Sequence, residues 1–187
     1  ENKILKEIMN TFQAIILARG NSKGIKNKNL IKINNKPLLF WTIKNSINSK
    51  LINQTWVSSD SDKILKYAKS IGAKTIKRPF ELVQDNSSSE SGWIHAAKFI
   101  DNKKINFENI VALQATSPIR SSEDLDKAIK FYVKKKYDSL FSGTEVRDHN
   151  IWHYSKNETL KANYNFKKRN PRQLIKPKYI ENGSFYI

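Results

Sequence analysis

The sequence predicts an α/β fold with a mostly parallel sheet and helices on both faces. Strand-like apolar runs alternate along the chain with helix-like stretches, and this βα rhythm is typical of parallel sheets. The 187 residues suit a single domain, and 39% hydrophobic residues, among them four Trp, seven Tyr and nine Phe, are enough to build its core. Folds of this kind bind their ligands outside the carboxyl ends of the strands.

The predicted elements follow from apolar patterning. Short apolar runs, typical of buried strands, occupy Ala14–Leu17, Thr55–Ser59, Lys74–Lys77 and Ile110–Leu113. Each is followed by a longer stretch with helical spacing, at Pro37–Asn48, Ser61–Ile71, Ser88–Ile100 and Ser122–Lys135. The helix starts carry signals of their own, with a proline in one first turn and capping residues at Asp60–Asp62 and Ser121–Asp124.

The alternation of strand-like and helix-like segments ends after Asp138. Tyr137–Ser142 is predicted as a further strand, whereas residues 149–177 are aromatic, basic and poorly periodic, as in an arm that leaves the core and returns. We expect this protruding arm to pack against another subunit, because aromatics and arginines suit an interface. Tyr179–Ile187 is predicted as a strand broken at Asn182–Gly183, and because the sequence stops within it, we expect more chain to follow.

The composition limits the kinds of binding partner that we expect for this protein. The formal net charge is +17, but only six of the 34 basic residues are arginine, and scattered lysines are typical of a solvated surface. The absence of cysteine excludes a disulfide framework and a thiolate zinc site, and no apolar run approaches the roughly 20 residues that span a bilayer. We therefore expect a cytoplasmic protein that binds neither nucleic acid nor membranes.

A glycine-containing loop follows the first strand, from Leu17 to Leu30. Its backbone N–H groups and the cations of Arg19, Lys23 and Lys28 have a spacing that can surround a polyphosphate. The loop lacks the ending of a Walker A motif, and the chain contains no G-x-G-x-x-G. A tight turn with ordinary surface lysines explains the loop equally well.

Polar segments also follow the third and fourth strands. Arg78–Ser89 combines an arginine with a serine run, whose hydroxyls suit a ribose or a base edge. The simpler explanation is a serine helix cap and an arginine paired with a nearby acid. Gln114–Arg120 places an amide where it can bind a sugar hydroxyl or a carboxylate. Arg120 could equally pair with Glu123 or Asp124.

Taken together, these segments resemble the CMP-sialic acid synthetase family, also called acylneuraminate cytidylyltransferases. The resemblance covers essentially the whole chain, and its most specific blocks are ARGNSKGIKNKNL, RPFELVQDNSSS and LQATSPIR. YDSLFSG and ENGSFYI look more like the animal and nonulosonate branch than the enzymes for the eight-carbon sugar of lipopolysaccharide. The resemblance implies a three-layer, Rossmann-like nucleotidyltransferase fold for residues 1–187 and a homodimer or higher homo-oligomer, in which the arm 149–177 completes a neighbour's site.

Carried over residue by residue, the resemblance assigns roles to the loops. It places the CTP phosphates against Arg19, Lys28 and Asn29, and the cytidine near Arg78, Ser87 and Ser89.

The resemblance places the acidic sugar near Gln114 and the arm. Arg172 matches the family's essential arginine and is our candidate both for catalysis and for gripping the sugar carboxylate, with Arg169 as the alternative. Ile180 stands near a position where some bacterial members have arginine.

The resemblance also implies Mg²⁺ as a cofactor, held by a D-x-D pair beyond the asparagine-glycine strand, where this chain has ended. Asp60–Asp62 has the same spacing, but helix capping is its simpler explanation. We assign no metal ligand within the chain.

The predicted function is the activation of a sialic-acid-like nonulosonic acid by CTP, giving a CMP-sugar and pyrophosphate. Such a transfer needs positioning and charge neutralisation but no protein nucleophile. Two alternatives remain: a nucleotidyltransferase for another acidic sugar or nucleotide, and a basic module that binds RNA or polyphosphate through its lysines and aromatic arm.

Overall fold

The computed structural model describes residues 12–22, 24–146 and 150–187. The described chain forms two compact units. The first runs to Phe141 and takes in Gly183–Ile187, and the second is Ser142–Asn182. Each unit is treated by itself below.

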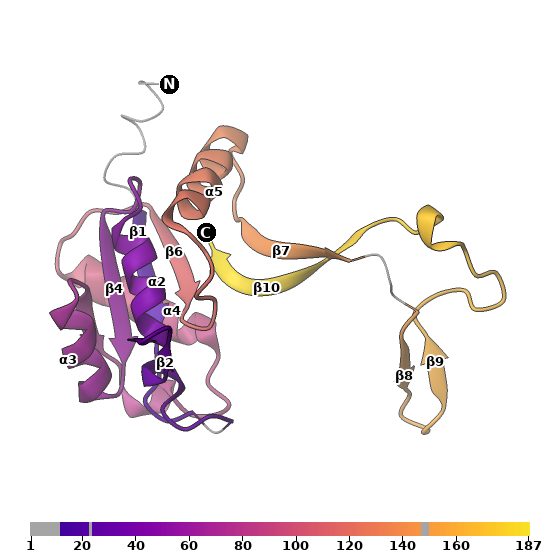
Figure 1. Cartoon of the computed structure of the whole chain (residues 1–187), viewed down its shortest axis with the longest axis horizontal. Helices are drawn as coiled ribbons and strands as arrows, with labels where there is room; N and C mark the ends of the chain where they lie inside the picture. Colours follow the sequence, from indigo (N-terminus) through magenta and orange to yellow (C-terminus); the bar gives the residue numbers. More distant parts are fainter. Residues whose placement is uncertain (1–11, 23, 147–149) are drawn as a thin grey trace. The chain divides into compact units, whose positions relative to one another are not determined.

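The sheet has the strand order β5-β4-β1-β6-β10-β7 (Figure 1). Its parallel part consists of β1 (Phe12–Leu17), β4 (Gln54–Ser59), β5 (Lys74–Lys77) and β6 (Asn109–Gln114). Its remaining strands are β10 (Lys178–Tyr186), which is antiparallel to β6, and β7 (Phe141–Val146). The predicted mostly parallel sheet is confirmed.

Helices cover both faces of the sheet, as predicted. Alternation along β1 separates the two cores, because successive side chains of a strand point to opposite faces. Ile16 packs in the core with α2 (Leu38–Ile47), α3 (Asp62–Ser70) and α5 (Ser122–Lys135). Ile15 packs on the other face with Ala96 and Ile100 of α4 (Ser89–Asn102) (Figure 1). The first unit is therefore a three-layer α/β/α structure.

Short elements lie in the loops. A hairpin of β2 (Lys32–Ile33) and β3 (Lys36–Pro37) turns at Asn34 and Asn35, whose φ angles of 48° and 62° are ones that asparagine tolerates well. Two 3₁₀ turns, η1 (Lys28–Leu30) and η2 (Phe80–Leu82), follow β1 and β5.

The second unit contains the hairpin of β8 (Trp152–Tyr154) and β9 (Leu160–Ala162) and the turn η3 (Arg172–Leu174). The Trp152 ring contacts Tyr164 and Phe166, with centroids 6.1 and 5.5 Å away. This small aromatic cluster orders the hairpin, yet Trp152 and Phe166 stay about half exposed.

Two sequence-based boundaries were wrong. The strand expected at Tyr137–Ser142 begins only at Phe141, because Lys136 leaves α5 with a left-handed φ of 53° and Tyr137 packs on Phe131. The break expected at Asn182–Gly183 is absent. Strand β10 continues through these two residues, because Gly183 adopts a φ of 67° that glycine tolerates without strain.

Two of the four α-helices in the described ranges begin with a side-chain cap, and α2, which follows Pro37, has none. Ser88 caps α4, and Ser121 forms a capping box with Asp124 at the start of α5. At α3, Ser61 makes no capping hydrogen bond with its side chain. No helix within the described ranges is both long enough and apolar enough to cross a membrane.

The capping box predicts a measurable stability difference. Ser121→Ala removes the acceptor for the Asp124 N–H, so the free energy of unfolding should fall by about 1 kcal/mol in urea titrations. Ser122→Ala, one residue inside the same helix, is the matched control and should change it by less than about 0.5 kcal/mol. Equal losses in the two variants would show that the cap is not what stabilises this end of α5.

Candidate functional site

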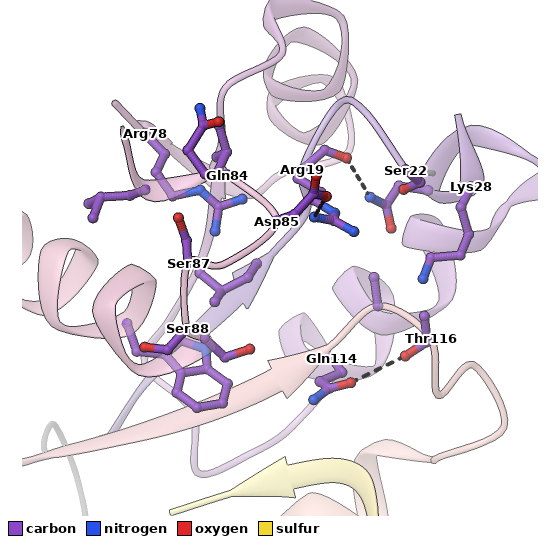
Figure 2. A pocket seen from close by; sticks show the side chains of 17 residues that line it. Arg19, Ser22, Lys28, Arg78, Gln84, Asp85, Ser87, Ser88, Gln114 and Thr116 are labelled. Atoms are coloured by element: carbon purple, nitrogen blue, oxygen red, sulfur yellow. Dashed lines mark hydrogen bonds and ion pairs between the residues drawn. The ribbon is translucent and has the colours of Figure 1, made fainter. Parts of the chain in front are cut away.

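A pocket of about 340 Å³ lies at the carboxyl ends of the parallel strands. Four segments line it: the end of β1 with the loop after it, the loop that joins β5 to α4, the start of α4, and the end of β6 with the residues after it. In Figure 2 the labelled side chains of these segments surround one open space, with Lys28 pointing its ammonium group inward. This is the edge at which an α/β sheet is expected to bind ligands.

All the described candidates from the first unit come together at this pocket. Its lining includes Arg19, Lys28, Asn29, Arg78, Ser87, Ser89 and Gln114. Lys23 lies outside the described residues. The remaining candidate, Arg172, belongs to η3 of the second unit, and its side chain lies outside the described part of the structure.

The loop after β1 holds Arg19 by its backbone. Asn29 is 5% exposed and donates from Nδ2 to the Arg19 carbonyl at 2.9 Å. The Arg19 guanidinium itself is partly exposed and lies 3.5 Å from a carboxylate oxygen of Asp85, across the pocket wall. An exposed pair at this distance contributes little to stability, so Arg19 is able to exchange Asp85 for a bound anion.

Gly20 allows this loop to approach the next strand. Its N–H donates to Asp60 Oδ1 at 2.8 Å, and a Cβ at this position would lie 2.7 Å from the Ser61 Cβ. Only glycine fits such a contact without displacing backbone. The Asp60 side chain therefore anchors the loop.

The second acid of the D-x-D spacing is engaged as well. Asp62 accepts from Lys77 Nζ at 2.5 Å, and the same ammonium donates to the Asp60 carbonyl at 2.8 Å. The described residues contain no group of three or more His, Cys, Asp or Glu placed to hold a metal ion. In this structure both carboxylates accept hydrogen bonds from groups of the neighbouring loops.

Arg78 is the most constrained cation of the site. It directly follows β5, is only 6% exposed, and its Nε finds no hydrogen-bond partner among the described residues. Burial lowers the pKa of Arg78, an effect that Asp60 opposes and Arg19 increases. A buried cation to which no acid of the described residues is bonded is costly in free energy, and an anion or a strong acceptor bound at this end of the pocket would offset that cost.

Helix α4 makes room for that guanidinium. A Cβ on Gly92 would lie 3.0 Å from Arg78 Nη1 and 3.0 Å from a Leu17 methyl. His95, one turn further on, has its pKa lowered, first by burial and then by Arg78. Trp93 also lines the pocket, and its ring packs on the ring of Tyr186, with 5.5 Å between the two ring centroids.

Sequence reasoning did not single out Gly92 and Trp93. A glycine within a helical pattern was the available signal, because it often marks a close approach. Sequence reasoning also missed Ser22, which lines the pocket and is 7% exposed.

The serine run builds the opposite wall. Ser87 donates its hydroxyl to the Glu81 carbonyl at 3.0 Å, and Ser88 accepts from the Ser91 N–H as the cap of α4. Ser89 is the first residue of that helix. The N-terminal turn of α4, with its partial positive charge, thus borders the pocket.

Gln114 ends β6 at the base of the pocket (Figure 2). Its Oε1 accepts from Thr116 Oγ1 at 3.4 Å. Arg120, six residues further on, is buried and donates from Nη1 to the carbonyl of Ser184 and to its Oγ. The alternative of an ion pair with Glu123 or Asp124 is not formed in the described residues, where the Arg120 side chain bonds to β10 instead.

In the second unit, Arg169 has a local partner. With the Asn150 amide oriented so that its oxygen faces the guanidinium, Arg169 donates to it from Nη2 at 2.7 Å and from Nε at 3.0 Å. Arg169, the alternative to Arg172, is therefore part of the packing of its own unit.

Two known cytidylyltransferases are similar to this chain in sequence. N-acylneuraminate cytidylyltransferase A of Danio rerio is 38% identical over 181 residues, which are 94% of this chain and 41% of that protein. A pseudaminic acid cytidylyltransferase of Campylobacter jejuni is 32% identical over 132 residues, which cover 70% of this chain and 57% of that protein. The chain thus spans about two fifths of the length of the first of these relatives.

The fold has counterparts among solved structures. The crystal structure of 4-diphosphocytidyl-2C-methyl-D-erythritol synthase from Anaerococcus prevotii superposes with a TM-score of 0.67 at 16% identity, covering 100% of this chain and 72% of that one. A sequence model of the cytidylyltransferase family matches residues 13–183. The resemblance in the sequence is thereby confirmed, and the chain belongs to the cytidylyltransferase family.

Proposed function

We propose that this chain forms the nucleotide-binding and sugar-binding part of an enzyme that transfers CMP from CTP to a sialic-acid-like nonulosonic acid. The observation that carries the proposal is Arg78, a buried guanidinium to which no acid of the described residues is bonded, in a pocket at the carboxyl ends of parallel strands. The names of the relatives, which include acylneuraminate and pseudaminic acid, support the class of acidic sugar.

The phosphate end of CTP is assigned to the loop after β1. Arg19 and Lys28 supply two cations to the pocket, while Asn29 fixes the Arg19 backbone. Charge-assisted hydrogen bonds from such groups are among the strongest available to a protein.

The cytidine end is assigned to Arg78, Ser87 and Ser89. Because Ser87 uses its proton on the Glu81 carbonyl, its lone pairs are left to accept, which suits the amino group of cytosine better than the carbonyl of uracil. Ser89 lies in the first turn of α4, where N–H groups can donate to the nucleotide.

The reaction itself is an in-line displacement at the α-phosphorus of CTP. The anomeric hydroxyl oxygen of the sugar forms the new P–O bond and gives up its proton to water, while the bond between the α-phosphorus and the oxygen that bridges it to the β-phosphorus breaks, releasing pyrophosphate. Gln114 orients the sugar, and the cations of the pocket stabilise the charge that develops on the phosphate oxygens.

Mg²⁺ is part of the proposal, since bound to the triphosphate it would neutralise charge on the leaving group. The described residues do not fit such an ion, because Asp60 and Asp62 are already bonded to Gly20 and Lys77. We therefore assign no metal ligand and no metal-dependent step to this chain.

The arm is assigned to a subunit interface. Its exposed aromatics, among them Tyr154 at 75% exposure, favour a protein partner over bare solvent. In the proposed homodimer, Arg172 grips the carboxylate of the sugar. The reaction is placed in the cytoplasm, where CTP is available.

A pyrophosphate-release assay with the full-length protein tests the proposal. With N-acetylneuraminate or pseudaminic acid as acceptor, CTP should support release at least ten times faster than ATP, GTP or UTP, and EDTA should abolish it until Mg²⁺ is restored. Equal rates with all four nucleotides, or no release together with salt-sensitive binding of mixed RNA, would overturn it.

The arm gives a second prediction. Arg172→Lys keeps the charge but loses the planar fork for a carboxylate, so kcat/KM for the acidic sugar should fall by about 10- to 100-fold while KM for CTP stays within twofold. Sedimentation should give a dimer at micromolar concentration for both wild type and variant.

Arg169→Lys is the matched control in the same segment, and because Arg169 is bonded to Asn150 we expect a smaller kinetic effect. A variant Arg172→Lys with wild-type kinetics for the sugar, or a fully active monomer, would exclude the role given to the arm.

A further inference from the structure

We infer that Arg120 is a positioning residue for the acidic-substrate end of the pocket, an inference that rests on the proposed role of Gln114. Arg120 does not line the pocket. It joins two segments more than 60 residues apart in the chain, because its Nη1 donates to the Ser184 carbonyl and, at 3.1 Å, to the Ser184 Oγ.

The residue before Ser184 is the one that meets Gln114. A Cβ built on Gly183 would lie 3.2 Å from Gln114 Oε1, 3.3 Å from Cδ and 3.4 Å from Nε2. The Gln114 amide therefore packs directly on the Gly183 backbone, whose φ of 67° is held in the left-handed region. By holding Ser184, Arg120 fixes the surface on which that amide rests.

Helix α2 supports both ends of this link. Asn45 donates from Nδ2 to the Arg120 carbonyl, and Thr42 donates from Oγ1 to the Gln114 carbonyl at 3.4 Å. The segment from Gln114 to Arg120 is thus attached to α2 at its two ends, and the Arg120 side chain extends the same scaffold to β10. A shift of β10 would therefore be transmitted to Gln114.

The surroundings of Arg120 also make it replaceable. It is 7% exposed, and burial lowers its pKa to about 10, with Asp124 opposing the shift. Its Nε and Nη2 have no hydrogen-bond partner within the described ranges, and no carboxylate there is bonded to it. Removing this cation leaves no buried anion behind, so Arg120→Met should fold.

The test combines substrate kinetics with a signal that needs no substrate. In Arg120→Met, KM for the acidic sugar should rise at least tenfold while KM for CTP stays within twofold, and Arg120→Lys should recover part of the loss. In ¹H–¹⁵N spectra of the ligand-free protein, the side-chain amide of Gln114 and the backbone amide of Gly183 should shift in Arg120→Met.

Asp126→Ala is the matched control for simple destabilisation, because Asp126 accepts from Ser49 and from the backbone of Lys50 and is not among the residues that line the pocket. It should lower the thermal midpoint without moving the Gln114 signal or either KM. The inference is overturned if the Gln114 signal stays unmoved in Arg120→Met, or if both KM values rise together as stability falls. Since the spectra require no activity, a protein that fails to release pyrophosphate still tests the positioning claim separately from the proposed function.

Discussion

The site depends on one buried charge. Arg78 directly follows β5 and is buried where it lines the pocket, and within the described part of the chain no acid is bonded to it. Its charge is partly offset by Asp60 at longer range and made less favourable by Arg19. A fold tolerates such a group when a bound ligand supplies the missing hydrogen-bond acceptor. The free-energy cost of burying the cation in the ligand-free protein is then recovered when the ligand binds.

The parallel sheet accounts for the convergence of the other groups. The strands β1, β4, β5 and β6 are parallel and end at the same edge of the sheet. The loops that follow them are therefore brought together by the sheet itself. Two glycines then allow close contacts between neighbouring segments of the site. Gly20 lets the first loop touch Ser61, and Gly92 leaves the volume that the Arg78 side chain fills.

Periodicity predicted the parallel strands and the helices to within a few residues, since apolar alternation and capping residues are local signals that burial reinforces. The family resemblance singled out Arg19, Lys28, Arg78 and Gln114, and each lies at the end of a strand or in the loop after it. Their partners were not predictable. The bond from Arg120 to Ser184 and the contact of Gly183 with Gln114 depend on tertiary register, which no local pattern encodes, and the strand at 137–142 was displaced by the left-handed end of α5 at Lys136.

A calorimetric titration of CTP into the wild type and Arg78→Met tests the central claim most directly. Methionine fills a similar volume, and since no carboxylate in the described residues is bonded to Arg78, the variant should keep its thermal midpoint. Loss of a charge-assisted contact of roughly 1.5–3 kcal/mol predicts CTP binding that is about 10- to 100-fold weaker. A folded variant that binds CTP as tightly as the wild type would contradict the account.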